Sequence, residues 1–190
     1  FSPDAMPDLV VLERHTFEDL GDGRTRLTSQ SMVESFEFRD VFLDAGHATY
    51  DVYRECAERG WVALMGDRRA TFVHRTKSGK SIQRFYSPRR KVVLGHNRHC
   101  FAHYWSNLNI KDTLARLRRN QDPERGATWE VPDDIDDEYL AQMESEQRVK
   151  DGGKWLWRQI GKRPNHYLDC EAMQAAAATM LKLIGRESVV

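Results

Sequence analysis

Residues 41 to 65 constrain the fold of this chain more than any other segment. Val41 to Leu43 is a short apolar run that ends at Asp44 and a glycine-containing turn. An amphipathic stretch with helical spacing follows, and Gly60 is placed to end that helix. Trp61 to Met65 is a second apolar run. A strand, a helix and a strand in this order build parallel sheet, so we predict an α/β fold.

The remaining segments predict further strands and helices around this unit. The turn Gly21-Asp22-Gly23 separates two alternating segments and predicts an N-terminal β-hairpin. Residues 70 to 94 alternate around a turn at Lys77 to Lys80 and predict a second hairpin. Helices are expected over residues 110 to 120, 134 to 149 and 169 to 184.

The charge balance removes one simple route to nucleic-acid binding. Lys plus Arg and Asp plus Glu both number 29, so no overall basic field draws the chain onto DNA. Any DNA affinity must come from local patches such as Arg84 to Lys91. Taken alone, such a run is also typical of a solvated helix or strand face.

Cysteine usage and hydropathy bear on the cellular compartment. Cys56, Cys100 and Cys170 are widely spaced and form no C-x-x-C pair, which argues against a secreted disulfide framework and against a cysteine zinc site. The longest apolar stretch, Ala175 to Ile184, is shorter than a membrane span. A reducing cytoplasm without a membrane partner is therefore expected.

Two acidic residues stand where a fold can hold a carboxylate firmly. Asp44 directly follows the first apolar strand, and Asp169 directly precedes the long C-terminal helix. Two such carboxylates at one edge of a sheet would suit Mg²⁺, which prefers hard oxygen ligands. The local alternative is that Asp44 caps a turn and Asp169 caps a helix.

Five short motifs occur in a fixed order between residues 41 and 185. They are F-L-D-A-G-H-A-T-Y-D-V-Y-R-E-C (Phe42 to Cys56), N-I-K-D-T-L (Asn109 to Leu114), W-E-V-P (Trp129 to Pro132), D-E-Y-L-A-Q-M-E-S-E (Asp137 to Glu146) and N-H-Y-L-D-C-E-A-M-Q-A-A-A (Asn165 to Ala177). In this order they resemble the motifs of the C-terminal nuclease domain of the bacteriophage terminase large subunit, lambda-type GpA family.

This resemblance implies a fold, a reaction and a site. The fold would be ribonuclease-H-like, a mixed sheet flanked by helices. Asp44 and Asp169 would be catalytic and would bind Mg²⁺ or Mn²⁺, and a metal-activated water would attack phosphorus in line while a second metal stabilises the leaving oxygen. Basic side chains would contact the phosphate backbone of double-stranded DNA; the candidates are Arg84, Arg89, Arg90 and Lys111.

The resemblance also implies partners and a setting. They are double-stranded DNA, the terminase small subunit and the portal, in the cytoplasm of a bacterial host that carries the phage or prophage. The packaging ATPase would lie upstream of this segment. Thr76 to Ser81 ends like a phosphate-binding loop, but His74 stands where that motif needs glycine.

Residues 1 to 40 resemble a different family. They are similar to the late strands of START-like domains related to heat-shock ATPase activators, and the aspartate that supplies the first metal ligand in terminases is not recognisable among them. We therefore expect a hairpin segment of separate origin at 1–40 and a nuclease-like domain at 41–190. A catalytically inactive terminase remnant or a DNA-binding fragment is the alternative function, and a START-like lipid- or protein-binding module is a third.

The segment around Cys100 offers one further reading. His96, His99 and His103 have a spacing that would bind zinc if the segment were helical, although no cysteine pair accompanies them.

Overall fold

The computed structural model describes residues 17–19, 25–27, 41–95, 97–131 and 133–184. The chain divides into two compact units, Phe1–Arg39 and Asp40–Val190. The described part of the first unit is an antiparallel pair of strands, β1 (Phe17–Asp19) and β2 (Thr25–Leu27). This pair confirms the predicted N-terminal hairpin. The separate origin expected for residues 1–40 stays a prediction, and most of them lie outside the described residues.

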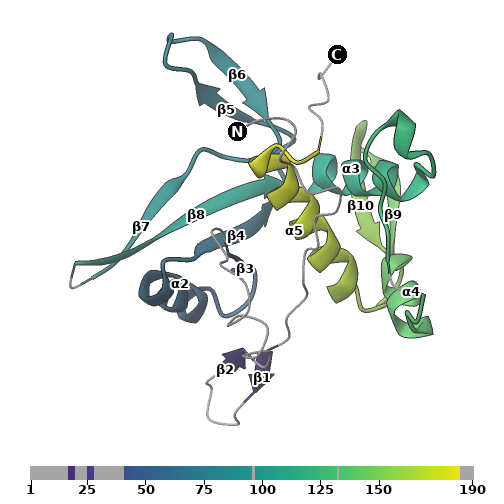
Figure 1. The fold of residues 1–190 in the computed structure, drawn as a ribbon, viewed down its shortest axis with the longest axis horizontal. Coiled ribbons are helices and arrows are strands. Elements are labelled where there is room, and N and C mark those ends of the chain that lie inside the picture. The colour runs from purple at the N-terminus through teal and green to yellow at the C-terminus, as the bar shows by residue number, and fades with distance from the viewer. Residues whose placement is uncertain (1–16, 20–24, 28–40, 96, 132, 185–190) are drawn as a thin grey trace. The chain divides into compact units, whose positions relative to one another are not determined.

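The second unit is built on a mixed four-stranded sheet (Figure 1). Its strands lie in the order β3 (Phe42–Asp44), β4 (Val62–Asp67), β8 (Arg98–Ser106) and β7 (Arg90–Gly95). β3, β4 and β8 run parallel, and β7 pairs with β8 antiparallel. Helix α2 (Thr49–Arg59) connects β3 to β4 and ends at Gly60, whose φ of 73° is left-handed. The predicted α/β fold and its strand–helix–strand unit are confirmed.

Two hairpins extend this unit. β5 (Phe72–Arg75) and β6 (Ser81–Arg84) form the hairpin predicted within residues 70 to 94. β9 (Glu146–Asp151) and β10 (Lys154–Gln159) form the other. The helix predicted over residues 134 to 149 is wrong in its second half, because α4 spans only Asp137–Met143. The pairing of β9 with β10 across a turn with positive φ at Gly152 and Gly153 takes the following residues into strand.

The remaining helices follow the prediction with shifted ends. α3 (Asn107–Arg119) begins directly after β8, and the Ser106 hydroxyl caps it by accepting a hydrogen bond of 3.2 Å from the Asn109 amide. A short 3₁₀ turn, η2 (Pro123–Arg125), follows. α5 (His166–Leu181) begins three residues before the predicted start, which places Asp169 inside its first turn. No helix in the described ranges is long and apolar enough to cross a membrane.

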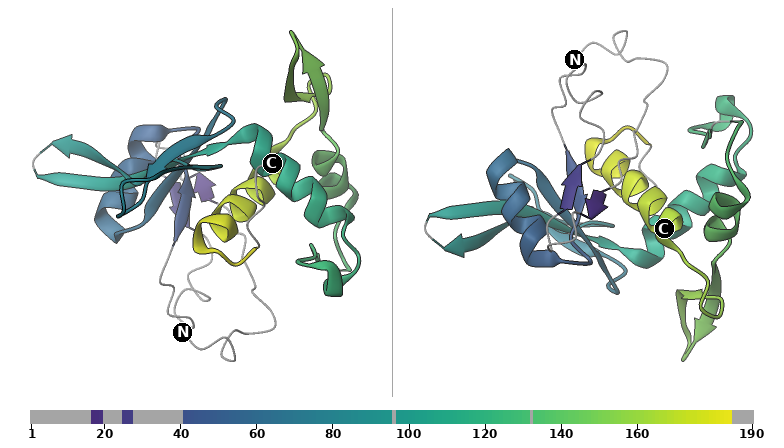
Figure 2. Two further views of the ribbon diagram at one scale, coloured as in Figure 1. Left: turned by 90° about the horizontal axis from the view of Figure 1, so that it is seen from above. Right: turned by 90° about the horizontal axis from the view of Figure 1, so that it is seen from below.

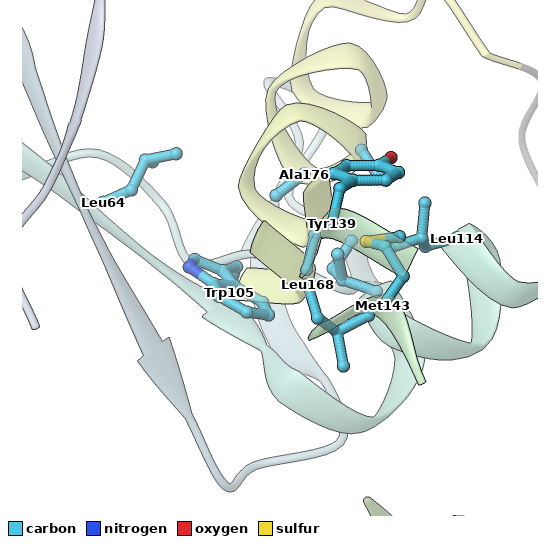
Figure 3. Packing of buried hydrophobic residues seen from close by; sticks show 10 residues of the cluster. Leu64, Trp105, Leu114, Tyr139, Met143, Leu168 and Ala176 are labelled. Atoms are coloured by element: carbon cyan, nitrogen blue, oxygen red, sulfur yellow. The ribbon is translucent and has the colours of Figure 1, made fainter. Parts of the chain in front are cut away.

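Side-chain alternation along the strands separates two hydrophobic cores. Leu43, Ala63 and Ala102 pack with Cys56 of α2 on one face of the sheet. The other face packs against α3, α4 and α5, as Figure 3 shows for Leu64, Trp105, Leu114, Tyr139, Met143, Leu168 and Ala176. Fully buried alanines of α5 let it lie close beside α3 (Figure 2); they are Ala172, Ala175 and Ala176. Phe42 belongs to this second core, and Asp44, two residues further along β3, points to the same face.

Candidate active site at the carboxyl end of the parallel strands

Asp44 is the last residue of β3, where the chain turns sharply. Its Oδ1 accepts a hydrogen bond of 2.8 Å from the amide of Gly46. A Cβ atom at Gly46 would lie only 3.1 Å from the same oxygen. A glycine therefore lets the backbone wrap closely around the Asp44 carboxylate and fix its direction.

Asp169 lies in the first turn of α5, and two donors hold its carboxylate. Oδ1 lies 2.7 Å from Nζ of Lys111, and Oδ2 accepts a hydrogen bond of 3.0 Å from Nδ2 of Asn165. The side chain of Asp169 is still 39% exposed. A carboxylate that is oriented on two sides yet open to solvent can bind a ligand from outside.

The two acids named by the sequence interact electrostatically. The pKa of Asp44 is raised, first by burial of the carboxyl group and then by the negative charge of Asp169; the Gly46 amide and the charge on His47 act in the opposite direction. Two carboxylates that repel each other form a place where a cation is favourable. The charge of Asp169 therefore acts on Asp44, and the role of the two residues as metal ligands stays a prediction.

Sequence reasoning missed two further members of this cluster. Oε1 of Glu146 lies 2.7 Å from the Lys111 ammonium and accepts a hydrogen bond of 2.8 Å from Asn165. Lys111 and Asn165 thus each bridge Glu146 and Asp169, which closes a ring of four side chains. The side chains of Lys111 and Glu146 are only 2% and 7% exposed. Both residues belong to motifs quoted above. Glu146 is the last residue of D-E-Y-L-A-Q-M-E-S-E, and Asn165 is the first residue of N-H-Y-L-D-C-E-A-M-Q-A-A-A, so these motifs could have indicated them as site candidates.

The basic residues proposed for DNA contact do not share one environment. Lys111 is buried inside the ring just described. The Arg89 guanidinium lies 3.7 Å from the centre of the Phe101 ring, and that of Arg90 lies 5.2 Å from the Tyr104 ring. Phe101 and Tyr104 are three residues apart in β8, so their rings point to opposite faces of the sheet. The strand register places Phe101, and with it Arg89, on the face to which Asp44 points.

A chain of ring contacts connects this face of the sheet to Arg84. The Arg84 guanidinium lies 5.8 Å from the centre of the Tyr86 ring, and Tyr86 packs edge-on against His103. Burial lowers the pKa of His103 and the charge of Arg89 lowers it further, against a hydrogen bond of Nδ1 to the Ser87 carbonyl. A neutral imidazole is therefore favoured here, and the arginines carry the positive charge.

The structure does not provide the helix that the zinc reading required. His99 and His103 lie in strand β8, and His96 is outside the described residues. Within the described ranges, no group of three or more His, Cys, Asp or Glu side chains is arranged to hold a metal ion. A cation site in this part of the chain would therefore rest on the pair Asp44 and Asp169.

Comparison with known proteins gives one match. The model of the family described as terminase large subunit gpA, endonuclease domain, matches residues 12–188. The matched range confirms the resemblance stated for residues 41–185 and extends it to residues 12–40. No curated protein and no solved structure matches the chain.

Proposed function

Because the chain belongs to the family of terminase large subunit gpA endonuclease domains, we propose that it cuts double-stranded DNA with the help of a divalent cation held by Asp44 and Asp169. One observation carries the assignment of these residues. Besides burial, the charge of Asp169 raises the pKa of Asp44, so two carboxylates from distant parts of the chain act on each other, and one of them ends a parallel strand. Open α/β sheets bind ligands outside this edge.

The donor chemistry fits Mg²⁺ or Mn²⁺. Both carboxylates are hard oxygen ligands, and a cation between them would relieve their repulsion. The Gly46 amide donates its hydrogen bond to Oδ1 of Asp44 and not to Oδ2. The side chain of Asp169 is partly exposed to solvent. When bound, a divalent cation would supply positive charge for the scissile phosphodiester and lower the pKa of a water molecule.

The chain's own residues supply orientation. The turn at Gly46 aims the Asp44 carboxylate, while Lys111 and Asn165 fix both oxygens of Asp169. A site whose ligands are held before the substrate arrives loses less rate to reorganisation than one built on mobile side chains.

DNA would approach on the face that carries Arg84 and Arg89. Each guanidinium lies over an aromatic ring, which limits its motion, and its N–H groups are donors suited to phosphate oxygens. Affinity from such contacts falls steeply with salt and carries little sequence information. The small subunit, the portal and the host-cell cytoplasm are the partners and setting we propose from the family.

A catalytically inactive, DNA-binding chain is the second candidate. It is favoured by the finding that the described residues contain no group of three acids arranged for a metal. The two candidates predict the same DNA affinity but a different fate for the DNA.

Cleavage of supercoiled plasmid separates the two candidates. We expect the purified chain to nick plasmid in Mn²⁺ or Mg²⁺, to be inactive in EDTA, and to lose activity when either Asp44 or Asp169 is replaced by alanine. Asp122→Ala, which removes an exposed acid next to the 3₁₀ turn, is the matched control. A folded chain that binds DNA but leaves it uncut with either cation would establish the inactive alternative.

A further inference from the structure

The ring formed by Lys111, Glu146, Asn165 and Asp169 has a role that cation binding by Asp44 and Asp169 does not explain. A buried ammonium is costly unless carboxylates surround it, and here it sits 2.7 Å from two of them. One of those two, Glu146, is nearly as buried as the lysine, whereas the other, Asp169, opens to solvent. Lys111 therefore connects the buried carboxylate of Glu146 to the partly solvent-exposed carboxylate of Asp169.

The charges of the ring and of Asp44 together do not cancel. When ionised, Asp44, Glu146 and Asp169 are three carboxylates, and Lys111 is the ammonium that faces two of them, which leaves a formal net charge of −2. A divalent cation would neutralise that charge. Without the positive charge of Lys111, the net charge of these side chains would be one unit more negative, and they would attract a cation more strongly.

We propose that Lys111 is a positioning residue that serves as the internal counter-ion of Glu146 and Asp169 and, by its positive charge, weakens the cation site. This inference rests on the proposed function, because it takes Asp169 to be a cation ligand. Lysine suits the task because its ammonium is a compact charge with three donors, which can face two carboxylates at once. The protein then holds Asp169 in place before a cation arrives, and the cation binds loosely enough to exchange.

The proposal predicts that the melting temperature of the Lys111→Met variant depends strongly on a bound divalent cation. Lys111→Met removes the charge and keeps the apolar stem, so two carboxylates are left facing each other around Asn165. In EDTA its melting temperature should fall by about 10 °C, as expected when one partner of a buried ion pair is removed. Saturating Mn²⁺ should restore more than half of that loss, because the cation takes over as counter-ion.

Affinity gives a second readout that a merely structural lysine would not change. One charge about 5 Å from a divalent cation alters the affinity for that cation by roughly tenfold when solvent screens the pair fully, which is the lower bound for this half-exposed site. Mn²⁺ should therefore bind Lys111→Met about tenfold more tightly than the unmodified chain in a calorimetric titration. Lys154→Met, which removes an exposed lysine of β10, is the matched control and should change neither readout.

A double variant keeps the test decisive if Lys111→Met fails to fold. Lys111→Met combined with Glu146→Gln removes one charge of each sign and keeps the net charge of the cluster. We expect it to be more stable in EDTA than Lys111→Met and to bind Mn²⁺ within about threefold of the unmodified chain. A double variant that binds Mn²⁺ tenfold more weakly or more tightly would overturn the counter-ion role.

The outcomes also separate this inference from the proposed function. Mn²⁺ binding to the unmodified chain together with unchanged affinity in Lys111→Met would overturn the inference and leave the function standing. An unmodified chain that neither binds Mn²⁺ nor cuts DNA, beside a Lys111→Met variant that gains Mn²⁺ binding, would sink the function and support the role of the lysine.

Discussion

Burial of the carboxyl group, and then the negative charge of Asp169 in the first turn of α5, raise the pKa of Asp44 at the end of β3. Two features of the fold produce this relationship. Alternation along β3 turns Asp44 to the face of the sheet that packs against α5. The small, fully buried alanines of α5 let that helix pack closely into the core on this face, and Asp169 lies in its first turn.

Replacement of Asp44 by asparagine should stabilise the protein while abolishing cleavage. A pKa raised in the folded state means that the ionised carboxylate destabilises the fold. This destabilisation is absent below the ordinary pKa of 3.8 and grows as pH rises through the folded pKa. Asparagine keeps the Oδ1 acceptor for the Gly46 amide, so the melting temperature should rise more at pH 7.5 than at pH 4.5.

The measurement is thermal unfolding at the two pH values, with plasmid nicking in parallel. Asp112→Asn, which changes an acid paired with Arg148 instead, serves as the comparison and should not stabilise the protein. A larger stabilisation at pH 4.5 than at pH 7.5 would contradict the raised pKa.

Gly46→Ala should lower the cleavage rate with little change in stability. The added Cβ would lie 3.1 Å from Oδ1 of Asp44, so the carboxylate must move by a few tenths of an ångström. Small displacements of a catalytic group are costly in rate, and we expect a loss of roughly tenfold to a hundredfold. Steady-state nicking and a melting curve test this. A large fall in melting temperature together with the loss of cleavage would contradict the prediction and mean that the turn is needed for folding.

Arg89→Ala should weaken DNA binding more than Arg90→Ala. The two residues are neighbours in sequence, but their guanidinium groups stack on opposite faces of the sheet, and only Arg89 shares the face of Asp44. Loss of one phosphate contact lowers the slope of log affinity against log salt by about one. Fluorescence anisotropy over a range of salt concentrations measures this slope, and equal effects of the two substitutions would argue against docking on that face.

The thiol of Cys56 should be almost unreactive in the folded protein. Burial, followed by the charges of Cys100 and Glu55, raises its pKa from 9.0 to about 12, which lowers its thiolate fraction roughly a thousandfold. Exposed Cys170 should react first with a chromogenic disulfide at pH 8, and Cys56 only on unfolding. Fast modification of Cys56 in the native protein would show that the core around α2 opens readily.

The sequence predicts the sheet and the two acids because their signals are local. Apolar runs ending at Asp44 and a helix beginning near Asp169 need only periodicity and position to be recognised. The role of Lys111 could not be foreseen in this way. Its partner Glu146 is 35 residues away in sequence, and the segment that carries Glu146 reads as helix until its pairing with β10 is known.

Asn165 illustrates the same limit at shorter range. It lies four residues before Asp169, a spacing that lets the two side chains meet in the first turn of α5. The second contact of Asn165, to Glu146, depends on the β9–β10 hairpin and is a property of the tertiary fold.

Binding of one Mn²⁺ ion by both acids is tested most directly by paramagnetic broadening of backbone amide signals. In a ¹⁵N-labelled chain, substoichiometric Mn²⁺ should broaden the amides of Gly46 and Asp169 at the same concentration and spare that of Gly79 in the β5–β6 turn. Asp44→Asn and Asp169→Asn should each abolish the broadening at both positions. Broadening confined to one segment, or persisting there in both variants, would contradict a cation shared by Asp44 and Asp169.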